Sequence, residues 1–165
     1  MSCNKEIREK ANKLLKDNCL FVPPVNAKEL ALNMGLKVVF VDFNQTANFQ
    51  DVSGFIHSSS RTLYVNANES PKRQNFTIAH EIGHYILGHT NSEEYSMLYR
   101  VSSITNEEDS NLEKEANYFA ANLLVPEQFL KNIIKSYPGI TDAQLGNMFF
   151  VSDIVIRYRR SHVGV

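Results

Sequence analysis

Apolar and polar positions follow two different periods along this chain. Near the start, apolar residues recur at i, i+4, i+7 and i+8, which predicts an amphipathic helix over about residues 4–18. The apolar face of this helix is made of Ile7, Ala11, Leu14 and Leu15. A second helix should begin at Asn26, because an Asn side chain can cap a helix and Glu29 follows three positions later, the spacing of a capping box.

The next stretch is rich in β-branched and aromatic residues. The run LKVVFVDF over 36–43 predicts one strand, and two shorter extended segments follow at 53–58 and 61–66. A tight Ser-rich turn joins the two shorter segments, which is typical of a hairpin. These residues together predict a small antiparallel sheet.

Helical periodicity returns after the sheet. Ser70 followed by Pro71 is a strong helix start, and this helix should run to about Gly88. Residues 90–106 are polar without a clear period and predict a loop. Further helices are expected over about 110–124, after Pro126, and after Thr141, which forms a capping box with Gln144. Helices around a small sheet make an α+β fold.

The composition describes an ordinary globular domain. The chain has 165 residues, of which 43% are hydrophobic and 21% charged, with a formal net charge of -1. A chain of this length buries roughly 70% of its unfolded surface, so a metal is not needed merely for folding. The near-zero charge gives no bulk attraction to nucleic acid or anionic lipid, and no apolar run approaches the ~20 residues that span a bilayer. We expect a single domain over 1–165.

The N-terminal residues bear on the compartment. Charged residues occupy the segment from Lys5 to Lys10, where a secretory signal peptide would need an apolar stretch. We therefore expect a cytoplasmic protein.

The helix over 70–88 carries the residues with the clearest chemistry. His80, Glu81 and His84 form an H-E-x-x-H motif, in which two histidines one helical turn apart project from the same face. Both imidazoles can then reach one zinc ion at ~2.1 Å. Glu81 points roughly 100° away from His80 and can take a proton from a metal-activated water. We interpret His80 and His84 as metal ligands and Glu81 as a general base.

A catalytic zinc needs a third protein ligand, and the helix over 110–124 offers two. At about 100° per residue, Glu113 lies about 60° from the centre of the buried face of that helix and Glu115 about 100°. We favour Glu113 as the third ligand, and Glu115 remains the alternative. Asn117, four residues after Glu113, has an amide that can hydrogen-bond a ligating histidine. A His/His/Glu set favours zinc but also accepts manganese or another divalent ion.

Two sequence blocks resemble a known family. FTIAHEIGHYILGH over 76–89, followed by EKEANYFAANLLVPE over 113–127, is similar to the ImmA/IrrE family of metallopeptidases. The resemblance implies a minimal zincin-like fold and a gluzincin-like site with His80, His84 and the Glu of the second block as ligands. In the Glu-x-x-x-Asp pattern of related gluzincins, Glu113 takes the ligand position, and Asn117 stands where those proteins have Asp.

The same resemblance implies a substrate class and a placement for the hairpin. The substrates implied are repressors of the helix-turn-helix type, often encoded beside the protease on mobile elements. The hairpin before the active-site helix would line the cleft and bind an extended peptide by β-addition.

Several other polar residues have open roles. His57 is either a surface histidine at a strand end, which we favour, or an oxyanion donor. His89 is interpreted as structural, because a cation is favourable at a helix C-terminus. A tyrosine hydroxyl can also stabilise an oxyanion, and the candidates are Tyr95, Tyr99 and Tyr118.

The C-terminal segment over 141–162 permits a competing interpretation. Two short helices with a turn near Val151, followed by several arginines, resemble a helix-turn-helix unit. With a net charge of -1 and no second basic patch, direct nucleic-acid binding is disfavoured against a helical cap on the domain.

We therefore expect a cytoplasmic zinc endopeptidase that cleaves a protein substrate, a transcriptional repressor, through metal-activated water. One alternative is a non-catalytic regulator or binding module for DNA or protein, with a structural metal. Another is a toxin-like component of a two-gene module. The sequence predicts neither the cleavage site nor the oligomeric state.

Overall fold

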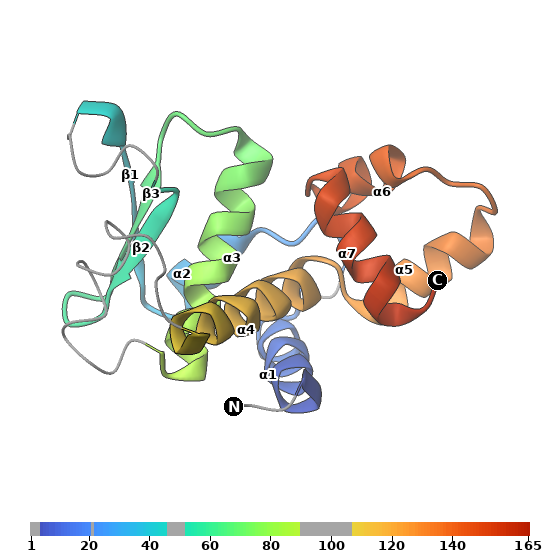
Figure 1. The fold of residues 1–165 in the computed structure, drawn as a ribbon, viewed down its shortest axis with the longest axis horizontal. Coiled ribbons are helices and arrows are strands. Elements are labelled where there is room, and N and C mark those ends of the chain that lie inside the picture. The colour runs from blue at the N-terminus through green and yellow to red at the C-terminus, as the bar shows by residue number, and fades with distance from the viewer. Residues whose placement is uncertain (1–3, 21, 46–51, 90–106) are drawn as a thin grey trace.

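The α+β fold expected from the sequence is confirmed in a computed structural model, which describes residues 4–20, 22–45, 52–89 and 107–165 (Figure 1). The helices within these ranges are α1 (Asn4–Asp17), α2 (Ala27–Asn33), α3 (Pro71–Leu87), α4 (Glu107–Leu124), α5 (Glu127–Ser136), α6 (Asp142–Phe149) and α7 (Asp153–Val163). The strands are β1 (Lys37–Val41), β2 (Gly54–His57) and β3 (Thr62–Asn66), and a short 3-10 helix covers Phe43–Gln45. None of these helices has both the length and the apolarity needed to cross a bilayer.

The sheet is mixed, which corrects the antiparallel sheet predicted from the sequence. The strand order is β1-β3-β2, with β2 antiparallel to β3 as the hairpin requires. β1 pairs in parallel with β3, Lys37 lying opposite Thr62. The chain reverses direction twice between β1 and β3, so these two strands run the same way when they become neighbours. A tight turn fixes only the hairpin pairing, and the position of β1 depends on contacts distant in sequence.

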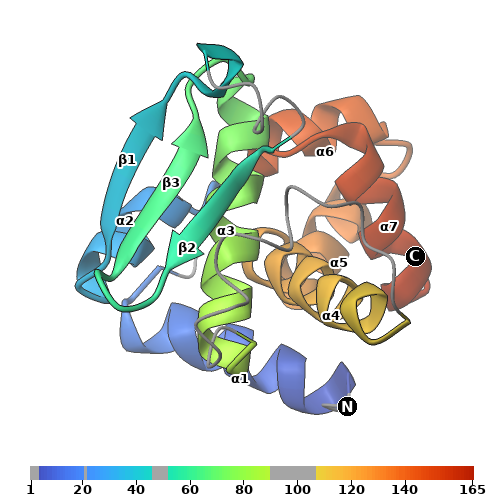
Figure 2. The same cartoon turned by 60° about the vertical axis from the view of Figure 1, so that its left-hand side comes forward.

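Helix α3 lies between the sheet and α4, and α2 packs against both β1 and α3. Figure 2 shows the sheet on one side of α3 and α4 on the other, with α7 beyond α4. Ser70 caps the start of α3 by accepting a hydrogen bond from the Arg73 amide, and Gly88 ends it in the left-handed conformation at φ 79°. Both ends agree with the sequence prediction. The buried core is continuous from α1 and α2 through the sheet and α3 to the C-terminal helices.

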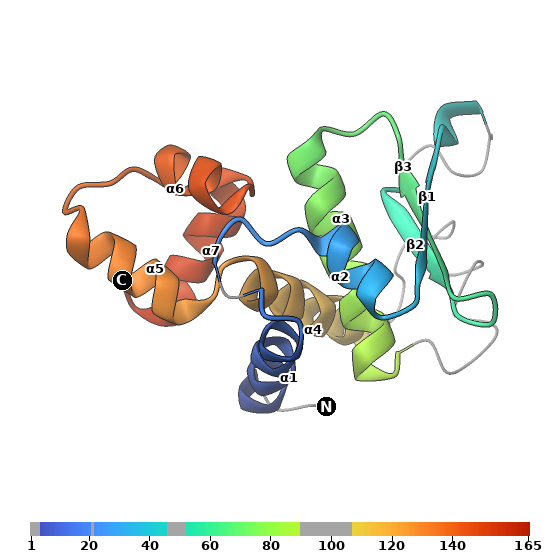
Figure 3. The ribbon, with the colours of Figure 1, turned by 180° about the vertical axis from the view of Figure 1, so that it is seen from behind.

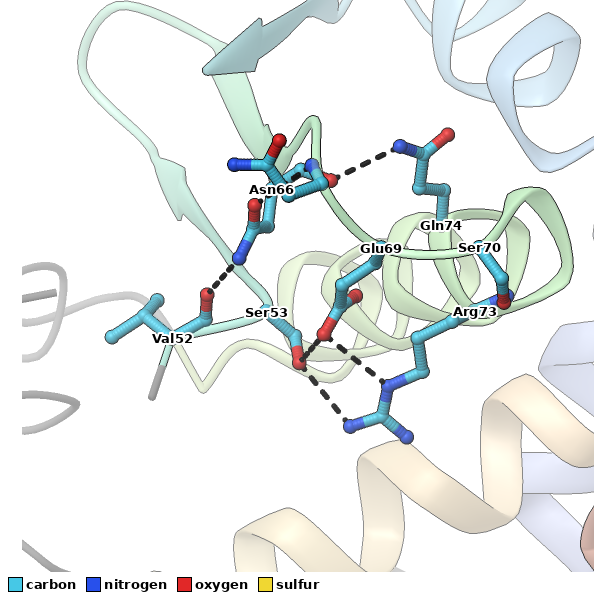
Figure 4. A network of polar contacts seen from close by, with 8 residues as sticks. Val52, Ser53, Asn66, Glu69, Ser70, Arg73 and Gln74 are labelled. Atoms are coloured by element: carbon cyan, nitrogen blue, oxygen red, sulfur yellow. Dashed lines mark hydrogen bonds and ion pairs between the residues drawn. The ribbon is translucent and has the colours of Figure 1, made fainter. Parts of the chain in front are cut away.

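A polar network fixes the hairpin to the first turn of α3 (Figure 4). The Ser53 hydroxyl donates to a Glu69 carboxylate oxygen at 2.7 Å and accepts from the Arg73 guanidinium at 3.2 Å. The Gln74 amide donates to the backbone carbonyl of Asn66 at 3.1 Å. These contacts set the edge strand β2 at a defined position beside the helix that carries the histidines.

Helices α5, α6 and α7 gather at the end of the molecule opposite the sheet (Figure 3). The predicted capping box of Thr141 and Gln144 is present at the start of α6. Arg159 is buried, 1% exposed, and its Nε donates to the Val125 carbonyl at 3.0 Å. Arg160 lies 3.2 Å from the Asp142 carboxylate. Two of the arginines that suggested a recognition helix therefore serve the packing of α7.

Candidate metal centre

The two histidines of the H-E-x-x-H motif face each other along α3. The Nε2 atoms of His80 and His84 are 3.0 Å apart. His84 is 1% exposed, and the side chain of His80 is 12% exposed. The pair therefore lies at the edge of the buried interior, with the His80 side partly exposed to solvent.

The Glu113 carboxylate, on α4, contacts both of these histidines. One of its oxygens lies 3.1 Å from His80 Nε2, and the other lies 3.1 Å from His84 Nε2. Glu115, the alternative left open by the sequence, instead contacts His89 at 3.2 Å. The structure thus brings Glu113, and not Glu115, to the two motif histidines.

Electrostatics keeps Glu113 ionised. Burial by itself raises the pKa of Glu113, but hydrogen bonds from His80 and His84 in the metal-free protein, together with the charge that these histidines carry when protonated, outweigh burial and hold the pKa well below its usual range. An ionised carboxylate beside two imidazoles is the state in which such groups bind a divalent cation.

The spacing of these groups fits a metal ion. Donor atoms around a tetrahedral zinc, each at ~2.1 Å from the ion, are about 3.4 Å from one another. The separations of 3.0 and 3.1 Å among the two histidine nitrogens and the Glu113 oxygens are close to that value. Two neutral nitrogens and one carboxylate are also the donor types of catalytic zinc sites, so the residues fit the implied metal.

Gly83 allows α4 to approach α3 closely enough to form this cluster. A Cβ atom at position 83 would lie 3.1 Å from the Phe119 ring and 3.2 Å from the backbone carbonyl oxygen of Ala116. Both neighbours lie on α4, in the turns that follow Glu113. The glycine in the middle of the motif therefore has a packing role: it sets the distance between the two ligand-bearing helices.

The second ring nitrogen of His80 is held by α4 as well. Its Nδ1 lies 3.0 Å from the side-chain oxygen of Asn117. That oxygen can only accept, so Nδ1 carries the proton in this bond and Nε2 has its lone pair directed to the metal position. The contact matches the role expected of Asn117 from its spacing after Glu113.

A longer relay holds His84. Its Nδ1 lies 3.1 Å from Nδ1 of His89, whose Nε2 lies 3.2 Å from a Glu115 carboxylate oxygen. Burial lowers the pKa of His89, as does the charge of His84, although Glu115 acts in the opposite direction. A neutral His89 that donates to Glu115 must accept from His84 Nδ1, so His84 presents its Nε2 lone pair to the metal position.

The contact between His89 and His84 is not predicted from the sequence. The sequence predicts a structural residue at the helix end, and His89 does follow the last turn of α3. The left-handed conformation of Gly88 then directs the chain so that the His89 ring packs on His84, with ring centroids 5.1 Å apart. A histidine directly after a helix-ending glycine, five positions after a predicted ligand, is the signal that could have indicated this.

The remaining sequence candidates are placed as follows. Glu81 is fully buried on α3, directly after His80. His57 ends β2 and contacts the Ser60 hydroxyl at 2.7 Å within the hairpin turn, which agrees with a strand-end residue. Tyr118 packs against His162 of α7, with ring centroids 5.6 Å apart. Tyr95 and Tyr99 lie outside the described residues.

Comparison with known proteins places these features in a family. The chain is 28% identical over 109 residues to Metallopeptidase ImmA of Bacillus subtilis (strain 168), an alignment that covers 66% of this chain. The chain matches only 62% of the length of that relative. A solved structure described as a Mycobacterium tuberculosis transcriptional regulator has a similar fold, with a TM-score of 0.67 over 95% of this chain and 46% of that one. At 17% identity, this second likeness concerns the fold alone.

A family model described as Peptidase_M78, IrrE N-terminal-like domain, matches residues 31–161. The match covers both sequence blocks that resembled ImmA/IrrE metallopeptidases, and it spans the sheet, α3, α4 and most of α7. With the H-E-x-x-H helix and Glu113 brought together in the fold, the chain belongs to the Peptidase_M78 family of IrrE N-terminal-like metallopeptidases.

Proposed function

We propose that this protein is a zinc-dependent endopeptidase in which His80, His84 and Glu113 hold the metal and Glu81 is the general base. One observation carries the proposal: ligand atoms of the three metal-binding residues, from two helices far apart in sequence, lie within 4.8 Å of one another. Family membership supports peptidase chemistry at this place.

The metal and the protein residues have separate tasks. When bound, a divalent ion supplies Lewis-acid polarisation of the peptide carbonyl and makes water a stronger acid. His80 and His84 bind it through Nε2, and Glu113 binds it as an ionised carboxylate. Zinc is the ion we propose from the donor set, and manganese or another divalent ion remains compatible with the same donors.

Glu81 moves the proton in this proposal. Its carboxylate takes a proton from the attacking water and delivers it to the nitrogen of the leaving amine. Full burial of Glu81 favours this role, because a carboxylate removed from bulk water exchanges protons with the reacting groups rather than with solvent.

The substrate we propose is a protein, bound in extended form along β2. Within the described sheet, β2 lies at an edge and runs beside α3, so its backbone groups can pair with an added strand. The relative named Metallopeptidase ImmA supports a peptide substrate, and the family resemblance points to a repressor of the helix-turn-helix type. A repressor substrate would place the activity in the cytoplasm.

Cleavage of such a repressor tests the proposal directly. Zinc-loaded protein incubated with a helix-turn-helix repressor encoded beside it should yield discrete fragments, and a chelator should abolish them. Glu81→Gln should lose cleavage while it keeps its zinc, whereas Glu127→Gln, an acid on α5, should cleave normally. Undiminished cleavage by Glu81→Gln would overturn the mechanism.

The DNA-binding alternative gains no support from the C-terminal helices. Arg159 is buried against the Val125 carbonyl, and Arg160 pairs with Asp142. A recognition helix needs its basic side chains free to reach phosphates and base edges. We therefore propose α6 and α7 as part of the wall of the catalytic domain.

A further inference from the structure

An apolar recess lies beside the metal centre, between α3, α4 and α7. It has a volume of about 390 Å³, which falls within the ~300–1,000 Å³ common for ligand pockets. Its inner surface is mostly apolar and is contributed by Phe76, Ala121, Ile154, Val155 and Tyr158, although polar and charged residues, among them Lys72 and Arg73, line it as well. Each of the three helices contributes to this surface, so the recess is a product of the tertiary fold.

The recess adjoins the metal centre through one residue that the two share. Asn117 belongs to both, because its oxygen contacts His80 and its side chain lines the recess. Phe76 stands one turn before His80 on α3, and Ala121 stands one turn after Asn117 on α4. Four residues of helix advance ~6 Å, so the recess begins about one helical turn from the ligand histidine.

That distance suits a substrate side chain. Residues of an extended peptide are ~3.3 Å apart and project alternately to opposite sides. A residue adjacent to a bond positioned at the metal centre can therefore extend a long side chain into the recess. Backbone pairing along β2 would orient the peptide without reading its sequence, so selectivity requires a side-chain pocket of this kind.

The mouth of the recess keeps apolar surface exposed to solvent. Ile154 at the start of α7 is 72% exposed, and Tyr158 one turn later is 36% exposed. Both side chains line the recess. Neighbouring exposed apolar groups at the rim of a pocket are typical of a binding site, since solvent-facing positions on a helix otherwise favour polar residues.

We infer that this recess is the specificity pocket of the enzyme, and that it receives a large aliphatic or aromatic side chain from the substrate residue next to the scissile bond. The inference rests on the proposed function, because it takes the bond to be cleaved at the centre formed by His80, His84 and Glu113. It adds a rule for the choice of substrate to the proposed cleavage.

A pair of inhibitors tests the pocket without a known substrate. The first is a peptide hydroxamate with an isobutyl side chain on the residue beside the hydroxamate, and the second has hydrogen in its place. Titration calorimetry with the zinc-loaded full chain should show about 10- to 100-fold tighter binding of the isobutyl compound, as expected for burial of a leucine-sized group.

Variants then locate the source of that preference. Ala121→Phe fills the recess and should reduce the preference to within about 3-fold, with the unsubstituted compound bound as before. Because Ala121 is buried, a second variant avoids the risk of misfolding: Ile154→Ser at the exposed mouth should lower the preference partially. Leu32→Ser, at a residue of α2 that is 53% exposed and outside the recess, is the matched control and should change neither affinity.

The outcomes separate the two proposals. Equal affinity of both compounds for the wild-type protein would overturn the specificity pocket and leave the metal centre supported, and it is the result expected if another part of the chain fills the recess. A preference that survives in a folded Ala121→Phe variant would also overturn the pocket. If neither compound binds the zinc-loaded protein, the accessible metal site itself fails, and the specificity pocket fails with it.

Discussion

The Nε2 atom of His89 lies 3.2 Å from a carboxylate oxygen of Glu115, and this contact ends a relay that starts at the metal centre. His84 joins the relay through its Nδ1, 3.1 Å from Nδ1 of His89. Outer residues of this kind fix the tautomer and ring orientation of a ligand. We expect His89 and Glu115 to position His84 although neither reaches the metal.

Removing the His89 nitrogens should weaken metal binding. His89→Phe keeps a ring in place but cannot accept a hydrogen bond from His84 Nδ1, so we expect zinc affinity to fall about 10- to 100-fold in a competition titration with a chromophoric chelator. Nitrogen NMR of the metal-free protein should show that His84 no longer holds its proton mainly on Nδ1. His162→Phe, on α7, is the control, and an unchanged affinity in His89→Phe would refute the relay.

The two glutamates of α4 should differ in their contribution to metal binding. Glu113→Ala removes a group that faces both histidines and should lower zinc affinity by at least about 100-fold. Glu115→Ala removes only the end of the relay, so a loss of about 10-fold is expected. The measurement is the same competition titration, with circular dichroism to check folding. A larger loss of zinc affinity in Glu115→Ala would indicate that Glu115 is the metal ligand and Glu113 the positioning residue.

The features that could be predicted from the sequence are those set by local patterns of residues. Ser70 and Gly88 bound the metal helix as predicted, because capping and left-handed termination depend on adjacent residues. The ranking of Glu113 over Glu115 agrees with the geometry, because positions on a helix face follow from the helical period alone.

The features that the sequence did not reveal depend on residues far apart in the chain. The parallel pairing of β1 with β3 joins segments separated by the whole of β2, and no turn signal encodes it. The apolar recess needs side chains from α3, α4 and α7 at once. The contact between His84 and His89 depends on the direction that the chain takes after Gly88. Helical periodicity predicts positions only within the helix, so it does not place His89.

Gly83 should be needed for both stability and metal affinity. An added methyl group would press on Phe119 and on the Ala116 backbone, and overpacking of this kind costs about 1–3 kcal/mol. Because the strain would separate α3 from α4, Gly83→Ala should also weaken zinc binding. Gly146→Ala on α6 is the matched control, since its Cβ would meet the Val151 carbonyl oxygen at 2.9 Å. It should lower stability in urea unfolding and leave zinc affinity unchanged; equal zinc affinity in both variants would contradict the role of Gly83.

The stability of the metal-free protein should fall as the pH drops below about 6.5. Burial and the charge of His84 lower the pKa of His89 below its ordinary value of 6.5. Below about pH 6.5, His89 therefore binds a proton more readily in the unfolded chain than in the folded protein. The free energy of unfolding decreases as the pH falls through this range, by up to about 1.4 kcal/mol per pH unit. The lowered pKa of Glu113 acts only below its ordinary value of 4.5. Urea unfolding in a chelator at pH 7.5 and 5.5 should show a smaller difference for His89→Phe than for the wild-type protein, and an equal difference would exclude His89 as the cause.

Replacement of Asn117 by aspartate should strengthen metal binding. Its side-chain oxygen accepts from His80 Nδ1 at 3.0 Å, and a carboxylate at the same place would accept a stronger, charge-assisted hydrogen bond. The imidazole then becomes a better metal ligand, so Asn117→Asp should raise zinc affinity about 10-fold and Asn117→Ala should lower it. Asn132→Asp on α5 adds the same charge at an exposed position and should leave the affinity unchanged. An equal increase in both Asp variants would attribute the effect to net charge and not to the His80 contact.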